Sequence, residues 1–130
     1  MKTNKKKILV VDDERAIVNL VKVYLQEEGY RVLVGYNGME ALEVVREKGP
    51  DLMILDLEMP ILDGFEVIER LKKDKTISHI PIIILTAYNI KKYRDKCFQL
   101  GVDKFIAKPF QRELLIREIN NIFNSEVANE

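Results

Sequence analysis

The sequence has one cysteine, no long apolar run and no excess of either charge sign. Cys97 has no second cysteine for an internal disulfide, and it lies at helical spacing from Ile90, Tyr93 and Leu100, which favours a role in buried packing. No run approaches the roughly 20 apolar residues of a membrane span, and the N-terminus lacks the apolar core of a signal peptide. These absences predict a cytoplasmic protein without an internal disulfide.

The charge balance argues against binding to nucleic acid or to a membrane. Acidic and basic residues number 21 each, so no overall field draws the chain toward a polyanion. The one local bias is a group of lysines near the start, which is most simply a solvated lead-in to the first strand: Lys2, Lys5, Lys6 and Lys7. We therefore expect the direct partners to be proteins.

The length and apolar content suit one compact domain. The chain has 130 residues, of which 47% are hydrophobic, and domains commonly run to about 100–150 residues. No internal repeat, linker or low-complexity tract interrupts the sequence. We predict a basic lead-in over 1–5, a folded domain over 6–123 and a fraying C-terminal tail over 124–130.

Short apolar runs rich in β-branched residues alternate with amphipathic stretches. The runs predict strands at 6–11, 31–35, 51–56, 81–86 and 103–107. Helical spacing between them predicts five helices, the clearest with Ile17, Leu20, Val21 and Tyr24 on its buried face. Because the strands are continuously apolar, we predict an α/β fold in which a parallel sheet is covered on both faces. Three glycines are expected as left-handed helix caps: Gly29, Gly49 and Gly101.

Polar residues follow four of the predicted strands. Asp12 and Asp13 end the first strand, Asp56 the third and Thr86 the fourth, and Lys108 follows the fifth. Ligands gather at the carboxyl ends of the strands in such sheets, so we expect these five side chains to converge on one edge.

Three carboxylates and a lysine together suit phosphoryl transfer. Crowded carboxylates repel one another unless a cation lies among them, and Mg²⁺ prefers such oxygen ligands together with a phosphate oxygen. A carboxylate can attack phosphorus to give an aspartyl phosphate, and the central Asp56 is the expected acceptor. Lys108 and Thr86 would share the negative charge of the transferring group.

Each residue taken alone also has a structural interpretation. Asp12 and Asp13 could simply cap the following helix, and Asp56 could end a strand. Thr86 alone is an ordinary strand end, and Lys108 alone is a solvated charge. Their joint placement at strand ends is what favours a functional site.

Four motifs resemble the receiver, or response-regulator, domain of two-component signalling. They are VVDDE at 10–14, DLMILDLEMPILDG at 51–64, PIIILTA at 81–87 and GVDKFIAKPF at 101–110, and the likeness covers residues 6 to 123. The resemblance implies a flavodoxin-like (βα)5 fold, doubly wound, with strand order 2-1-3-4-5. It further implies that Asp56 accepts a phosphoryl group from a histidine kinase or phosphotransfer protein.

The resemblance also implies a role for each residue around the acceptor. Mg²⁺ would be held by Asp13, Asp56 and the backbone carbonyl of Glu58, with Asp12 acting through water. Lys108 would pair with the phosphoryl group, and a cis peptide would precede Pro109.

In the family, signalling follows from a small rearrangement near the acceptor. Thr86 would bind the phosphoryl group and Phe105 would reorient with it. Glu58 and Tyr88 would flank the path of the water that removes the phosphoryl group, and Tyr88 would obstruct it.

Partner surfaces are implied as well. The kinase would contact the first helix and the loop after Lys108, through Arg15, Val18, Pro109 and Phe110. A downstream protein or a second copy of the chain would use the fourth helix, fifth strand and fifth helix, with Lys91, Asp95 and Phe98 on the fourth helix.

Other functions stay open on the sequence alone. A Mg²⁺-dependent hydrolase with an aspartyl-phosphate intermediate uses a similar acid cluster, and the chain could be a receiver fragment of a longer regulator. A flavin or nucleotide module would need a glycine-rich loop where VVDDERA supplies acids, which would repel phosphate. We expect a switch that catalyses only its own phosphorylation and slow dephosphorylation, and no other enzymatic turnover.

Overall fold

The computed structural model describes residues 6–128, with side chains as far as residue 125. The lead-in predicted over 1–5 lies outside this range. Strands and helices alternate along the described chain, in the order β1 (Lys7–Val11), α1 (Arg15–Glu27), β2 (Arg31–Gly35), α2 (Gly38–Lys48), β3 (Leu52–Leu55), α3 (Gly64–Lys73), β4 (Ile82–Thr86), α4 (Lys91–Gln99), β5 (Lys104–Ala107) and α5 (Arg112–Ala128).

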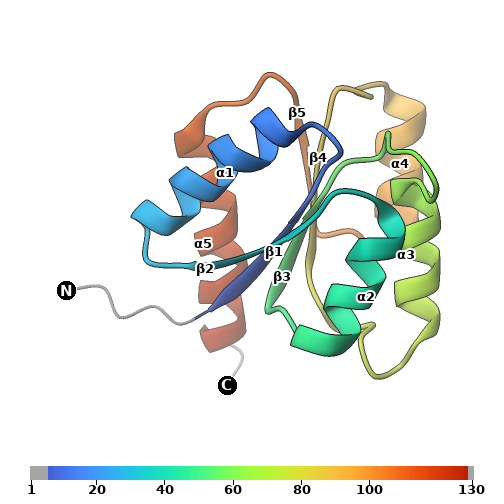
Figure 1. Ribbon diagram of the computed structural model, residues 1–130, viewed down its shortest axis with the longest axis horizontal. Helices are drawn as coiled ribbons and strands as arrows, with labels where there is room; N and C mark the ends of the chain where they lie inside the picture. The colour runs from blue at the N-terminus through green and yellow to red at the C-terminus, as the bar shows by residue number, and fades with distance from the viewer. Residues whose placement is uncertain (1–5, 129–130) are drawn as a thin grey trace.

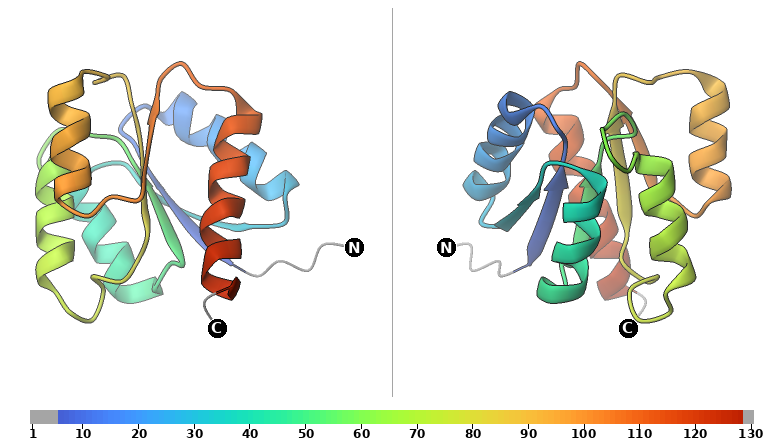
Figure 2. Two further views of the ribbon diagram at one scale, coloured as in Figure 1. Left: turned by 180° about the vertical axis from the view of Figure 1, so that it is seen from behind. Right: turned by 45° about the vertical axis from the view of Figure 1, so that its right-hand side comes forward.

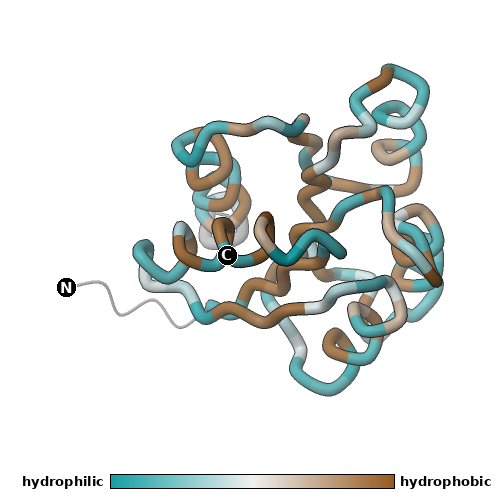
Figure 3. Tube along the Cα trace, turned by 45° about the horizontal axis from the view of Figure 1, so that its top comes forward, coloured by the Kyte–Doolittle hydropathy of each residue, from teal (hydrophilic) through white to brown (hydrophobic). Residues whose placement is uncertain are grey.

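The strands form one parallel sheet between two layers of helices. The strand order is β2-β1-β3-β4-β5, with α1 and α5 on one face and α2, α3 and α4 on the other (Figures 1 and 2). Apolar residues concentrate in the central strands, whereas the helices alternate between apolar and polar (Figure 3). The predicted doubly wound, flavodoxin-like α/β fold is therefore confirmed, including its strand order.

The register of the central strands positions the acids. Val11 of β1 pairs with Leu55 of β3, so the residues that follow them, Asp12 and Asp56, leave the sheet side by side. The chain runs from β1 to a neighbour on one side and later returns to β3 on the other side. Ligands of open α/β sheets bind at such a switch in strand order.

The buried face of α1 differs from the predicted one. Val18, Val21 and Leu25 are fully buried, whereas Leu20 is 41% exposed. Both sets of residues satisfy helical spacing, so the sequence pattern alone could not distinguish two overlapping stripes. The sheet selects the stripe that contains Val18.

Helix α4 is held to the core by few residues. It begins at Lys91, and Ile90, which was expected on its buried face, is the N-cap residue and half exposed. Cys97 is fully buried, as expected, and burial raises the pKa of its thiol to about 11. The thiol therefore stays protonated near neutral pH.

Three helices end close to a glycine, as predicted, whereas α5 ends later than predicted. Gly29, Gly49 and Gly101 have φ angles of 89°, 57° and 97°, which confirms the three left-handed positions. Helix α5 continues to Ala128, so the tail expected from residue 124 is helical over most of its length. Among the helices of residues 6–128, none is long and apolar enough to cross a membrane.

The start of α3 anchors the loop that follows Asp56. The Asp63 carboxylate accepts a hydrogen bond from the Glu66 N–H at 3.0 Å, and the Glu66 carboxylate accepts one from the Asp63 N–H in return. At Gly64 a Cβ atom would lie 2.5 Å from the Asp56 carbonyl oxygen and 2.7 Å from the Leu57 Cα. Only glycine allows the helix to approach the loop this closely.

A Gly64→Ala substitution should lower the free energy of unfolding by about 1–3 kcal/mol, because the added methyl group meets backbone atoms that cannot rotate away. Urea unfolding measures the loss. Glu69→Ala, at an exposed position of the same helix, serves as the control and should stay within about 0.5 kcal/mol of wild type. Equal stability of the two variants would show that α3 can move away from the loop at no cost.

Candidate functional site

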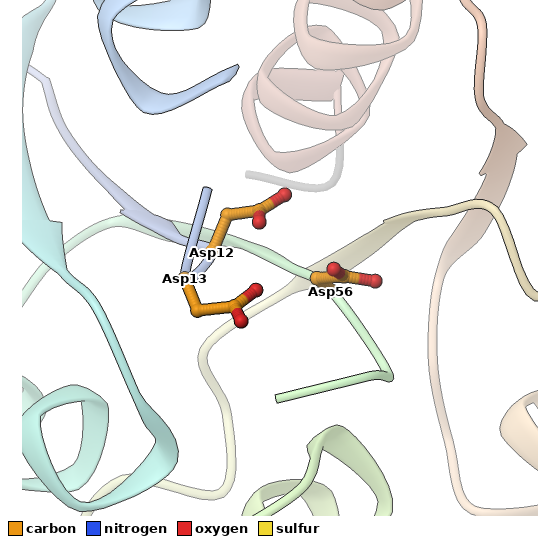
Figure 4. A group of neighbouring side chains, drawn as sticks. All are labelled: Asp12, Asp13 and Asp56. Atoms are coloured by element: carbon orange, nitrogen blue, oxygen red, sulfur yellow. The ribbon is translucent and has the colours of Figure 1, made fainter. Parts of the chain in front are cut away.

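Three carboxylates gather where β1 and β3 end. Asp12 and Asp13 follow β1, and Asp56 follows β3 (Figure 4). One carboxylate oxygen of each residue lies within 4.8 Å of those of the other two. Asp12 and Asp56 are buried, whereas Asp13 is exposed, so the cluster opens to solvent on the side of Asp13.

Lys108 follows the edge strand β5, and its ammonium contacts two of the acids. Its Nζ atom lies 2.6 Å from Asp12 Oδ2 and 3.4 Å from Asp56 Oδ2, and it is 3.7 Å from a Glu14 oxygen. The Lys108 N–H also donates a 2.8 Å hydrogen bond to the Thr86 carbonyl, which ties the end of β5 to the end of β4. The Lys108–Pro109 peptide is cis, as expected.

Burial and charge act in opposite directions on this group. Burial is the largest influence on Asp12 and raises the pKa of its carboxyl, although the hydrogen bond from Lys108 opposes that shift. Burial alone would lower the pKa of Lys108, but its hydrogen bonds and the charges of Asp12 and Asp56 outweigh that effect and raise it. Lys108 is therefore a permanent cation at neutral pH.

Thr86 and Phe105 lie on β4 and β5, the two strands that follow β3 in the order of the sheet. Thr86 is fully buried at the end of β4, and its Oγ1 accepts a 3.2 Å hydrogen bond from the Tyr88 N–H. Phe105, on β5, is half-buried and packs against the core cluster on the side of α2, α3 and α4. That cluster includes Cys97 of α4, so Phe105 packs against the same core as α4.

The donor atoms suit a hard divalent cation. Both oxygens of Asp12 are engaged, one by Lys108 and the other by the Glu14 N–H at 2.9 Å, which agrees with a role through water. The Glu58 N–H donates to Asp56 Oδ1 at 3.3 Å, so the Glu58 backbone lies beside the acceptor. Asp13 and Asp56 add carboxylate oxygens, which Mg²⁺ prefers.

The comparisons with known proteins identify the family. The model of the response regulator receiver domain matches residues 8–120. The chain belongs to this family. Receiver domains are signalling domains of two-component systems that interact with histidine kinases or phosphotransfer proteins, and they generally bind Mg²⁺ at an acidic site.

Relatives and solved structures agree with this assignment. The chain is 42% identical to the response regulator GtcR of Aneurinibacillus migulanus, over 81% of this chain and 42% of the relative. It is 35% identical to the probable transcriptional regulator ycf29 of Pyropia yezoensis, over 95% of this chain and 56% of the relative. The chain thus spans about half the length of these curated relatives.

Two solved receiver domains illustrate the structural likeness. A CheY-like receiver domain from Methanospirillum hungatei JF-1 has a TM-score of 0.90 at 26% identity, covering 98% of this chain and all of that one. The receiver domain of a sensor histidine kinase from Pseudomonas aeruginosa PAO1 has a TM-score of 0.80 at 30% identity, covering 88% of this chain and 93% of that one. That structure holds a magnesium ion coordinated in its active site cleft.

Three of the four residues expected to contact a kinase are accessible on this receiver domain. Arg15 and Pro109 are exposed, and Phe110 is half-buried against the ring of Tyr24. Val18 is fully buried in the core, so its expected role in direct partner contact is wrong. It lies on the sheet-facing stripe of α1.

Two features of the site were not anticipated. Glu14 approaches Lys108, and its place directly after Asp12 and Asp13 was the only signal in the sequence. Tyr88 stacks on Tyr93, a contact between a loop and a helix that residue spacing does not reveal.

We predict that Mg²⁺ stabilises the receiver domain through Asp13. At a concentration ten times its Kd, the ion should add about 1.4 kcal/mol to the free energy of unfolding. Asp13→Asn should lose this increment and be at least as stable as wild type in chelator, because one of three crowded negative charges is gone. Urea unfolding in Mg²⁺ and in chelator measures the increment and the stability of the variant without the ion. Glu69→Gln should keep the increment, and an unchanged increment in Asp13→Asn would contradict the assignment.

Proposed function

We propose that Asp56 accepts a phosphoryl group from a phosphohistidine of a sensor kinase or phosphotransfer protein. The observation that carries the proposal is the contact of the Lys108 ammonium with the buried Asp56 carboxylate at the carboxyl ends of the strands. An oxygen of Asp56 attacks phosphorus as the bond from phosphorus to the imidazole nitrogen breaks. The electron pair of that bond stays on the imidazole, which then takes up a proton.

The neighbouring groups compensate the charge of the phosphoryl oxygens. Lys108 already lies between Asp12 and Asp56, so its ammonium can stabilise charge on either side without a large movement. Asp13, Asp56 and the Glu58 carbonyl would hold Mg²⁺, and Asp12 would act on it through water. The ion supplies positive charge to the carboxylates and to the phosphoryl oxygens.

The hydrolase alternative is not favoured. The acid two residues after Asp56 is Glu58, which is exposed, whereas the comparisons point to a signalling domain and to no enzymatic family. The proposed chemistry is therefore limited to self-catalysed phosphorylation and slow dephosphorylation.

Asp56→Asn should abolish phosphorylation, because the amide is a poor nucleophile toward phosphorus. Incubation with a small acyl phosphate and Mg²⁺, followed by the mass of the intact protein, measures the uptake. Wild type and the exposed-site control Asp95→Asn should each gain one phosphoryl group. Equal uptake by Asp56→Asn would place the acceptor elsewhere.

We propose that Thr86 and Phe105 carry the signal to the surface formed by α4, β5 and α5. On this surface Lys91 and Asp95 form an exposed ion pair with 2.7 Å between Nζ and Oδ2, and Phe98 is 46% exposed. A downstream protein or a second copy of the chain would bind there. The kinase would dock nearby on Arg15, Pro109 and Phe110.

Thr86→Ala should still be phosphorylated but should fail to change α4. Two states that differ by a few kcal/mol can be biased by one such hydroxyl contact. Hydrogen exchange of α4 with and without beryllofluoride, an analogue of the phosphoryl group, measures the response. Thr76→Ala, outside the site, should respond as wild type does. A wild-type response from Thr86→Ala would refute the role of the hydroxyl.

We also propose that Glu58 and Tyr88 set the lifetime of the phosphoryl group, with Tyr88 obstructing the approach of water. Tyr88→Ala should therefore lose its phosphoryl group several-fold faster than wild type, since in-line attack is sensitive to small displacements of the nucleophile. The first-order decay in Mg²⁺ after removal of the donor measures this. Unchanged or slower decay would show that Tyr88 does not shield the site.

A further inference from the structure

Tyr88 is one end of a row of aromatic rings that crosses three parts of the fold. Its ring stacks on Tyr93 of α4, with 5.3 Å between centroids and 25° between planes. Tyr93 in turn packs on Phe65 of α3, with 5.7 Å between centroids and 55° between planes. The Lys96 ammonium lies 4.2 Å from the centre of the Phe65 ring. Tyr88 therefore rests on α4, and Tyr93 continues the row of rings to Phe65 of α3.

The same side chain reaches across to the loop after Asp56. The Glu58 carboxylate raises the pKa of Tyr88, first by its hydrogen bond with the phenol and then by its negative charge. Tyr88 and Glu58, from the loops that follow β4 and β3, also line the same open cleft of about 410 Å³ beside the site, together with Tyr93 and Phe65.

Tyr88 needs such support to hold one position. It lies in the loop between β4 and α4, outside regular structure, and is 40% exposed. An exposed tyrosine on a loop samples several rotamers, and under the proposed obstruction only some of them would cover the approach to Asp56. An offset or stacked aromatic pair shifts such a population by about two- to tenfold.

We propose that Tyr93 is a positioning residue that lengthens the life of the phosphoryl group by holding Tyr88 over the site. The inference rests on the proposed phosphorylation of Asp56. In the hydrolysis that Tyr88 is proposed to obstruct, a water oxygen bonds to phosphorus as the bond between phosphorus and the Asp56 oxygen breaks. The electron pair of that bond stays on the Asp56 carboxylate, and inorganic phosphate leaves with both protons of the water. Tyr93 touches none of these atoms and acts through the ring of Tyr88.

The placement of Tyr93 links the lifetime to α4. Tyr93 is half-buried on a helix of which only Cys97 is buried among the described side chains. A displacement of α4 would carry Tyr93 with it and change the support under Tyr88. The lifetime of the phosphoryl group would thus depend on the position of the helix that is proposed to bind partners.

The test is a double-mutant cycle on the rate of phosphoryl loss. Wild type, Tyr93→Ala, Tyr88→Ala and the double variant are phosphorylated with a small acyl phosphate, and first-order decay in Mg²⁺ is followed after the donor is removed. Tyr93→Ala should decay about two- to tenfold faster than wild type. In the Tyr88→Ala background the same change should have no further effect.

Two further variants separate positioning from general loosening of α4. Tyr93→Phe keeps the ring and should decay within about twofold of wild type. Leu100→Ala removes a half-buried core contact at the end of the same helix without touching the stack, and it should leave the decay rate unchanged. Urea unfolding shows how much stability each variant loses.

Each outcome decides the matter. Decay of Tyr93→Ala that matches wild type, or acceleration of equal size in the Tyr88→Ala background, would overturn the role of Tyr93 while leaving Asp56 as the acceptor. Acceleration by Leu100→Ala equal to that by Tyr93→Ala would also overturn it. A wild-type protein that takes up no phosphoryl group would instead overturn the proposed function itself.

Discussion

The site depends on the compensation of clustered negative charge by Lys108. Two of the three carboxylates are buried, where water screens their repulsion poorly, and the ammonium lies within 3.4 Å of both. The pairing is possible because Val11 and Leu55 are register partners, which sets Asp12 beside Asp56, and because β5 delivers Lys108 to the same edge. The proposed phosphoryl group would add negative charge beside a cation that is already in place.

The strands that hold the site are deeply buried, whereas α4 is packed on the core by few residues. Every residue of β3 and β4 is buried, so the ends of these strands hold Asp56 and Thr86 firmly. Helix α4 contributes only Cys97 to the buried hydrophobic core among the described side chains, whereas α2 and α3 each contribute three. An element with few buried contacts costs little free energy to displace, which supports α4 as the element proposed to respond.

Family membership concerns the domain as a whole, whereas the local geometry concerns residues particular to this chain. The receiver-domain match covers residues 8–120, a range that includes the acids and Lys108. It does not specify the residues that flank the acceptor in this chain. Tyr88, Tyr93 and Phe65 form a row of rings with individual geometry, and such features distinguish one receiver domain from another.

The sequence by itself determined the strands, their parallel arrangement and the polar residues that end them, because apolar runs and their boundaries are local properties of the chain. It could also place Asp12, Asp56 and Lys108 at one edge, since the carboxyl ends of parallel strands must meet there. Only the tertiary structure decided that Val18 is buried and that Tyr88 rests on Tyr93. These contacts depend on how helices rotate and pack against distant elements, and helical spacing is compatible with more than one such packing.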